Sequence, residues 1–276
     1  MSRIGSSFAR NRTSMFGLVF LVTFAAAAAF APWVVPQDPI FLNFDDLLES
    51  PSTSHFFGTD ESGRDLFARV VWGGRVSLQV GLFSMLIAST VGVLAGLTAG
   101  FYGRWIDSLI MRIVDTILAL PGLLLAIFLV GRLGPSLRNA MFAIAITFIP
   151  VFSRITRAGT LAIRETEYVE SARAIGASNS RIMLTAVLPN LLSTVIVQLS
   201  LGFGFAILTE AGLSFLGLGI QPPTPAWGSM LGAGREYMTV AWWLTTFPGL
   251  AIFFTVLSFN FIGDGLREAL DPRQRR

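Results

Sequence analysis

Several chemically useful side chains are scarce or missing in this sequence of 276 residues. It contains no cysteine and one histidine, and all 20 of its basic residues are arginine because lysine does not occur. Without cysteine there is no disulfide, thiol nucleophile or thiolate metal site. Without lysine there is no Schiff base and no phosphate-binding loop of the G-x-x-x-x-G-K-[ST] kind. If ATP drives this protein, another subunit is expected to hydrolyse it.

Charged residues are also scarce. They make up 13% of the chain, against roughly 25% in soluble domains. Hydrophobic residues make up 53%, and the mean hydropathy is +0.66. A helix needs about 20 apolar residues to cross the bilayer core. Six stretches meet this length, which predicts a membrane protein without a soluble domain: 14–36, 78–100, 109–131, 137–155, 191–213 and 241–263.

The first apolar stretch also fits a second interpretation. Arg3, Arg10 and Arg12 precede a run that includes alanines 25–29, which resembles a signal peptide with a small-residue cleavage site. The run is long for the apolar part of a signal peptide, and further spans follow it. A first transmembrane helix is therefore the favoured interpretation.

The distribution of arginine orients the spans. With the N-terminus inside, 14 of the 20 arginines fall in cytoplasmic segments and 6 outside, and basic residues are retained on the cytoplasmic side of membranes. Both termini are therefore expected in the cytoplasm. The single transmembrane domain 1–276 then divides into a tail and first span (1–36), an external loop (37–77), five further spans (78–263) that include the cytoplasmic loop 156–190, and a cytoplasmic tail (264–276).

Small residues and prolines predict how the spans pack. Gly92, Gly96 and Gly100 recur every four residues, so one face of the second span lets another helix approach closely. Proline lacks a backbone amide hydrogen and is expected to interrupt the third, fourth and sixth spans. The three positions are Pro121, Pro150 and Pro248. Such kinks fit either ordinary bundle geometry or the hinges of a gate.

The cytoplasmic loop 156–190 contains an amphipathic pattern. Tyr168, Val169, Ala172 and Ile175 share one face of a short expected helix, which Gly176 ends. A second short helix leads into the fifth span. Two short helices at a membrane surface fit the groove of a partner protein, and they equally fit a position on lipid headgroups. The nearby glutamates argue against lipid and the nearby arginines argue for it, so the residues alone leave both open.

The same loop resembles the coupling loop of permease subunits in binding-protein-dependent ABC importers, whose pattern is Glu-Ala-Ala, three residues, Gly, nine residues, Ile, one residue, Leu-Pro. Ser171 and Ala186 depart from that pattern, and both are small and compatible with a helix. The matching residues are Glu170, Ala172, Gly176, Leu188 and Pro189. The resemblance implies that an ATPase subunit contacts Tyr168, Val169, Glu170, Ser171, Ala172, Ile175, Gly176, Leu188 and Pro189.

Other segments are similar to the second, C-type permease of importers for dipeptides, oligopeptides and nickel. These segments are 55–60, 63–65, 75–78, 210–223, 227–228, 260, 263–267 and 270–273. The resemblance implies an all-α polytopic membrane protein with six transmembrane helices, built like the permease of a type I ABC importer. It implies ATP-driven import of di- or oligopeptides, with nickel, glutathione or opines as alternative solutes.

The resemblance also implies partners and a location. The expected partners are a second homologous permease, two ABC ATPase subunits, an extracytoplasmic solute-binding protein and the lipid bilayer, without nucleic acid. The chain itself is expected to be no enzyme and to hold no cofactor, because ATP and Mg²⁺ would bind to the ATPase. The expected location is the bacterial cytoplasmic (inner) membrane, which the chain would cross several times.

Five residues of the external loops are candidate contacts for the binding protein. They are Asp60, Arg64, Asp65, Gln221 and Trp227. The binding protein implied by the resemblance has to dock on this side of the membrane. A solvated acidic loop is the alternative interpretation for each of them.

Ionisable residues within spans are costly and indicate function. Asp115 lies near the inner end of the third span, one turn after Arg112, its expected partner. Glu210 lies near the outer end of the fifth span. Both fit a structural hydrogen bond or a place at a gate on the solute route. Both would also serve the main rival function, a proton-coupled secondary transporter.

A membrane-embedded enzyme is a further rival. His55 is the single imidazole, and it lies outside the spans. No nucleophile with its base and no set of metal ligands can be assembled from the residues present. The sequence therefore predicts no catalytic residue and no metal site.

Overall fold

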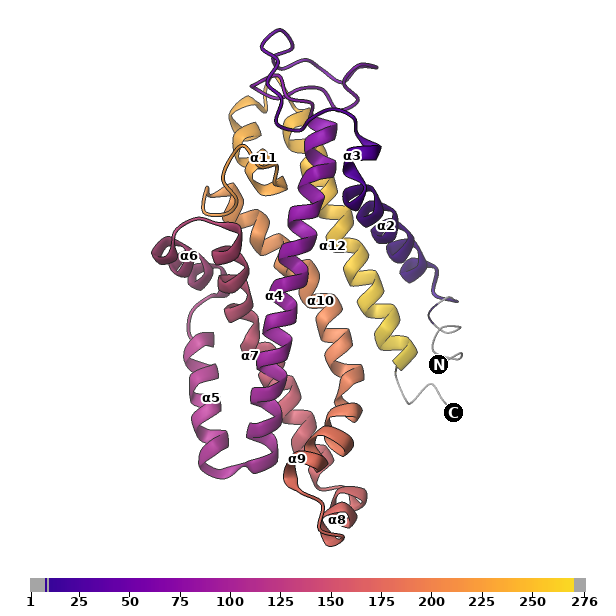
Figure 1. Cartoon of the computed structure of the whole chain (residues 1–276), viewed down its shortest axis with the longest axis vertical. Coiled ribbons are helices and arrows are strands. Elements are labelled where there is room, and N and C mark those ends of the chain that lie inside the picture. Colours follow the sequence, from indigo (N-terminus) through magenta and orange to yellow (C-terminus); the bar gives the residue numbers. More distant parts are fainter. Residues whose placement is uncertain (1–7, 9, 271–276) are drawn as a thin grey trace.

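The computed structural model describes residue 8 and residues 10–270, and in this part of the chain every regular element is helical. Figure 1 shows the arrangement. The helices are α2 (Arg12–Ala29), α3 (Ala31–Val34), α4 (Leu66–Tyr102), α5 (Arg104–Leu118), α6 (Gly122–Leu133), α7 (Leu137–Arg164), α8 (Glu167–Ala174), α9 (Asn179–Ile182), α10 (Leu188–Phe215), α11 (Trp227–Gly234) and α12 (Trp243–Leu270), with a π-helical turn (Met183–Val187) and a 3-10 turn (Arg235–Tyr237).

Five of the described helical segments are long and apolar enough to cross a membrane, and the pair α5 and α6 makes a sixth if it counts as one span. The prediction of six spans is confirmed, with a correction at the third. That span is bent by 87° between α5 and α6, where Pro121 stands just before the first residue of α6. Pro150 and Pro248 lie inside the unbroken helices α7 and α12. Each of these two prolines lies within one continuous helix, so neither divides its span as Pro121 does.

The helices extend further than the apolar stretches. α4 begins at Leu66, so residues 66–77 of the expected external loop form its first turns. α7 continues to Arg164 and α12 to Leu270, into segments expected to be loop and tail. The 37 residues of α4 span roughly 55 Å at 1.5 Å per residue. Because this exceeds the bilayer core of about 30 Å, hydropathy detects only the central part of the helix.

The tightest helix contact lies between α4 and α7. A Cβ atom on Gly92 would lie 2.6 Å from Cβ of Phe152, and one on Gly100 would lie 2.7 Å from Cβ of Thr160. A Cβ on Gly96 would meet the backbone oxygen of Ser153. The absence of side chains at the three glycines therefore permits the two backbones to approach, and the predicted glycine face is confirmed.

α4 lies at the centre of the bundle, with α7, α10 and α12 around it and α2 along the outside of α12 (Figure 1). The loop 36–65 and α11 cover one end of the bundle. The α8–α9 hairpin projects from the other end. The start of α2 and the end of α12 lie toward the hairpin, and Nδ2 of Asn11 donates to Glu268 at 2.8 Å. These ends and the hairpin therefore lie on one side of the bundle, the arginine-rich side that the sequence predicts to be cytoplasmic.

Candidate functional site

The α8–α9 hairpin is shaped by a glycine turn. Gly176 has φ +80°, a conformation that glycine adopts without strain. Its amide donates to the carbonyl of Arg173 at 2.9 Å, and the amide of Ala177 donates to the carbonyl of Ala172 at 3.0 Å. These bonds end α8 in the manner of a Schellman cap. The hydroxyl of Ser178 then caps α9, so the chain reverses within a few residues.

The residues of the predicted apolar face of α8 do not all point the same way. Val169 has no exposed surface and packs in a cluster with Ile182 and Leu191, and Ala172 packs against the same cluster. Ile175, by contrast, is 85% exposed. It follows the last residue of α8 at the glycine turn, so the helical spacing no longer fixes its direction. The prediction of one common face is therefore wrong: one part anchors α8, and Ile175 projects outward.

The remaining predicted coupling residues lie on or near the surface of the hairpin. Ala172 and Leu188 are half-buried. The exposed residues are Tyr168, Glu170, Ser171, Ile175, Gly176 and Pro189. An exposed isoleucine beside polar groups offers a partner roughly 1.5–3 kcal/mol of burial free energy. The hairpin therefore presents an apolar tip within a polar rim.

Two side-chain contacts fasten the hairpin to the ends of long helices, and a third joins two of those helices to each other. The guanidinium of Arg173 lies 5.4 Å from the ring centroid of Phe101, at the end of α4. Nη1 of Arg164 donates to the carbonyl of Gly100 at 2.8 Å, joining α7 to α4. Nδ2 of Asn190 donates to the Tyr168 hydroxyl at 3.3 Å, joining α10 to α8. A displacement of the hairpin therefore acts on α4, α7 and α10 together.

Asp115 is not paired with Arg112 as expected. Its carboxylate lies 2.6 Å from Nη2 of Arg154 on α7, and both side chains are more than half exposed. A second pair, which sequence reasoning missed, joins Asp107 of α5 to Arg157 of α7 through two hydrogen bonds. Residues on α7 are in reach because α5 runs beside it, which no local spacing reveals. Asp115 thus contributes a helix-to-helix contact on the surface of this chain.

Glu210 is fully buried between α10 and α4. Its carboxylate accepts hydrogen bonds from the hydroxyl of Ser214, one turn later at 2.6 Å, and from that of Ser77 on α4 at 3.3 Å. Both serines are buried as well. In this conformation the carboxylate ties α10 to α4, which favours the structural interpretation. Sequence reasoning missed both serines as partners, although the i, i+4 spacing of Ser214 was a signal.

Replacing Glu210 with leucine is expected to destabilise the protein by about 1–3 kcal/mol, because the buried serine hydroxyls lose their acceptor. Glutamine retains an acceptor oxygen, so Glu210→Gln should lose less. The thermal unfolding midpoint of each purified variant in detergent measures the difference. A leucine variant as stable as the native chain would contradict the role of Glu210 as a tie.

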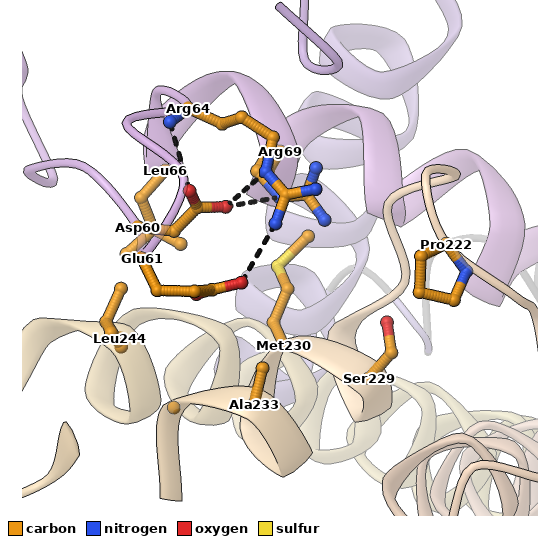
Figure 2. A pocket seen from close by; sticks show the side chains of 11 residues that line it. Asp60, Glu61, Arg64, Leu66, Arg69, Pro222, Ser229, Met230, Ala233 and Leu244 are labelled. Atoms are coloured by element: carbon orange, nitrogen blue, oxygen red, sulfur yellow. Dashed lines mark hydrogen bonds and ion pairs between the residues drawn. The ribbon is translucent and has the colours of Figure 1, made fainter. Parts of the chain in front are cut away.

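The external loop is held together by Asp60 (Figure 2). Its carboxylate accepts from the backbone amides of Ser62 and Arg64 at 2.9 and 3.0 Å, and from Nε of Arg64 at 2.7 Å. It also lies 3.4 Å from Nε of Arg69 on α4, whose Nη1 donates to the carbonyl of Pro39 at 2.9 Å. Asp60 and Arg69 are 4% and 5% exposed. They therefore fix the loop to α4 from within.

Two more of the predicted binding-protein contacts are internal. Asp65 caps α4 by accepting from the amide of Ala68 at 2.7 Å, and it also lies 2.9 Å from Nδ1 of His55. Trp227 has no exposed surface, and its Nε1 donates to the carbonyl of Val70 at 2.9 Å. As contacts for a docking protein, Asp60, Asp65 and Trp227 are therefore corrected to structural residues.

The other two predicted contacts lie closer to solvent. Arg64 is half-buried and pairs with Glu61 at 3.0 Å as well as with Asp60. Gln221 is exposed, and its amide donates to the carbonyls of Gly217 and Gly219. Among the described residues no group of three or more histidine, cysteine, aspartate or glutamate side chains is placed to hold a metal ion.

A bundle of helices long and apolar enough to cross a membrane, with a hairpin projecting from one end, defines a polytopic membrane protein. Residues 92–276 match the family described as binding-protein-dependent transport system inner membrane component. Residues 2–51 match the N-terminal transmembrane domain of oligopeptide transport permease C. The chain belongs to this family of inner-membrane transport components, as its sequence motifs predicted. It is thus a multi-pass protein of the inner membrane.

Similar proteins cover nearly the whole chain. The dipeptide transport system permease protein DppC of Alkalihalophilus pseudofirmus is 48% identical over 96% of this chain and 88% of its own length. The di/tripeptide transport system permease protein DppC of Pseudomonas aeruginosa is 47% identical, with 97% and 90% covered. The glutathione transport system permease protein GsiD of Pectobacterium atrosepticum is 44% identical, with 96% and 89% covered.

The fold also occurs among solved structures. A chain of the MetNI methionine ABC transporter, solved in inward-facing conformations, aligns with a TM-score of 0.60 at 17% identity. The alignment covers 74% of this chain and 97% of the other. At this identity the likeness shows the fold alone, and the helical arrangement agrees with the predicted permease-like architecture.

Proposed function

We propose that this chain is the C-type permease of an ATP-driven importer and moves di- or oligopeptides across the inner membrane. The observation that carries the proposal is the α8–α9 hairpin, whose exposed Ile175 has an apolar surface available for a partner. Family membership and the names of two relatives at 47–48% identity support the peptide substrate. Glutathione, itself a tripeptide, is the second candidate because of the relative named for its transport.

The proposed complex divides the work between subunits. Two ATPase subunits bind ATP and Mg²⁺ and close on one another, a second homologous permease completes the route, and an external binding protein delivers the solute. The closing ATPase displaces the hairpin, and the contacts of Arg173 and Asn190 pass that displacement to α4 and α10. Arg164 links α4 to α7, so α7 follows. The complete absence of lysine agrees with ATP hydrolysis outside this chain.

The proton-coupled carrier is less well supported. It would rely on Asp115 and Glu210, but Asp115 pairs with Arg154 and Glu210 is buried against two serines. A self-sufficient carrier also has no use for a projecting hairpin with an apolar tip. Both observations favour the ATP-driven importer.

Reconstitution tests the proposal. The chain is purified with its companion permease and ATPase subunits and placed in liposomes with ATP inside, with the binding protein and labelled dipeptide outside. Uptake is expected only with all components present, and omission of ATP or of the binding protein should abolish it. Uptake that persists without ATP would overturn the importer. Titration of the binding protein with dipeptides and glutathione by calorimetry decides between the two solutes.

A further inference from the structure

The cytoplasmic half of α10 has polar side chains along one face. Asn190, Ser193, Thr194 and Gln198 recur at intervals of three and four residues, which aligns them on one side of a helix. We call these four residues the polar stripe. They line a groove of about 600 Å³ between α10 and α12, on whose opposite wall lies Arg267. None of the predicted functional residues belongs to this groove.

The polar stripe lies within the membrane-spanning part of α10, where unsatisfied polar side chains are energetically unfavourable. Gln198 is ten residues beyond the start of α10, roughly 15 Å along the helix axis. Within the described part of the chain the side chains of Ser193, Thr194 and Gln198 form no hydrogen bond. Ser200 and Thr209 on the same helix, by contrast, donate to carbonyls one turn earlier.

Unsatisfied amide and hydroxyl groups in hydrocarbon are costly, so polar residues inside spans face protein or a water-filled cavity. The neighbouring helices of this chain do not cover the stripe, because Asn190 and Thr194 are exposed and the other two are half-buried. The charged Arg267, near the C-terminal end of α12, also lines the groove. Water in the groove satisfies these groups most simply.

The same face of α10 changes character toward the outside of the membrane. Beyond Gln198 it continues as Leu201, Phe205 and Leu208, and the last two are exposed apolar side chains. A wet groove that ends at large apolar groups has the form of a vestibule closed by a hydrophobic constriction. The other side of the helix differs, because the exposed residues there, Leu192 and Ile196, are apolar.

We propose that the polar stripe lines the cytoplasmic half of the solute route, a water-filled vestibule with Arg267 at its mouth and Phe205 and Leu208 at its closed end. This inference rests on the proposed import function and assigns residues to the path. The amides and hydroxyls of the stripe provide exchangeable hydrogen bonds for a peptide backbone. Asn190, the residue of the stripe nearest the cytoplasm, contacts Tyr168 of the coupling hairpin. The vestibule therefore adjoins the element that would open it.

Because the chain has no native cysteine, single cysteines report directly on access to water. Thr194→Cys and Gln198→Cys probe the stripe. Leu192→Cys and Ile196→Cys are matched controls on the same helix, because a step of two residues turns about 200° around the axis. The whole complex in inside-out vesicles is treated with a membrane-impermeant trimethylammonium methanethiosulfonate, and modification of this subunit is followed by mass.

Cysteines 194 and 198 are expected to react at least tenfold faster than the two controls when ATP is absent, since only a hydrated thiol ionises and reacts. Trapping the ATPase with ATP and vanadate should slow the reaction at both stripe positions, and modification should block ATP-driven release of dipeptide from the vesicle lumen. If either variant fails to accumulate, Ser193→Cys replaces it.

Stripe cysteines that react no faster than the controls in any state would overturn the vestibule, because a companion subunit or lipid would then cover this face. ATP-driven release of labelled dipeptide, enclosed with the binding protein in the lumen of the same vesicles, is measured before modification, which keeps the two proposals separate. Unreactive stripe cysteines in a complex that imports dipeptides overturn the vestibule alone. Failure of the native complex to import with ATP overturns the proposed function.

Discussion

Replacing Ile175 with glutamate is expected to lower ATP-driven uptake at least 100-fold while the permease still accumulates in the membrane. Ile175 is 85% exposed and belongs to none of the apolar clusters of the described residues. In the proposed complex, the loss of its burial removes roughly 1.5–3 kcal/mol. Burying a carboxylate there adds a further penalty of several kcal/mol. Each 1.4 kcal/mol corresponds to about tenfold in affinity, so both effects together exceed 100-fold.

The measurements are uptake by proteoliposomes and recovery of the ATPase subunits with the purified permease. Ile175→Leu is the matched control, because it retains the volume and the apolar character of the tip and should transport normally. Full uptake by Ile175→Glu would show that the exposed end of α8 is not the coupling contact. If the Ile175→Glu permease failed to fold and accumulate, Ile175 would have a structural role that its exposure does not indicate.

Replacing Asp60 with alanine is expected to destabilise the chain by about 3–5 kcal/mol, the usual cost of removing one partner from a buried ion pair. Arg69 would remain buried, and among the described residues it would keep the hydrogen bond to the carbonyl of Pro39 but no ion pair. The backbone amides of Ser62 and Arg64 would lose their acceptor at the same time. The external loop should therefore detach from α4 before the helical bundle unfolds.

Thermal unfolding in detergent and limited proteolysis of the loop measure the effect. Asp45→Ala, at an exposed position of the same loop, is the control and should change stability little. The double variant Asp60→Ala with Arg69→Leu should recover part of the loss, since it removes the unpaired charge. Equal stability of Asp60→Ala and the control would contradict the role of Asp60 as the centre of the loop.

The features that could be predicted from the sequence are those that depend on the local pattern of residues. Long apolar runs identified the spans, and the spacing of Gly92, Gly96 and Gly100 identified the face that α7 contacts. The coupling loop was found in the same way, since helical periodicity and the turn at Gly176 are properties of neighbouring residues. These features depend on interactions within a few residues, for which spacing is a sufficient guide.

What could not be predicted depends on distant partners. Asp115 was assigned to Arg112, three residues away, whereas its partner Arg154 comes from another helix. Trp227 looked like a surface aromatic because its burial against Val70 joins segments 157 residues apart. Charged loops were assumed to face solvent, and Asp60 shows the opposite. Spacing along a chain says little about such contacts, because tertiary packing decides them.

The length of α4 has a consequence for energy transfer across the membrane. One end of this helix is held by Asp65 and Arg69 beneath the external loop, and the other carries Phe101 under Arg173 of the coupling hairpin. A continuous helix of 37 residues is stiff, so loads applied at its two ends are shared. Linkage then requires reciprocity: the factor by which nucleotide changes the affinity for the external partner equals the factor by which that partner changes the affinity for nucleotide.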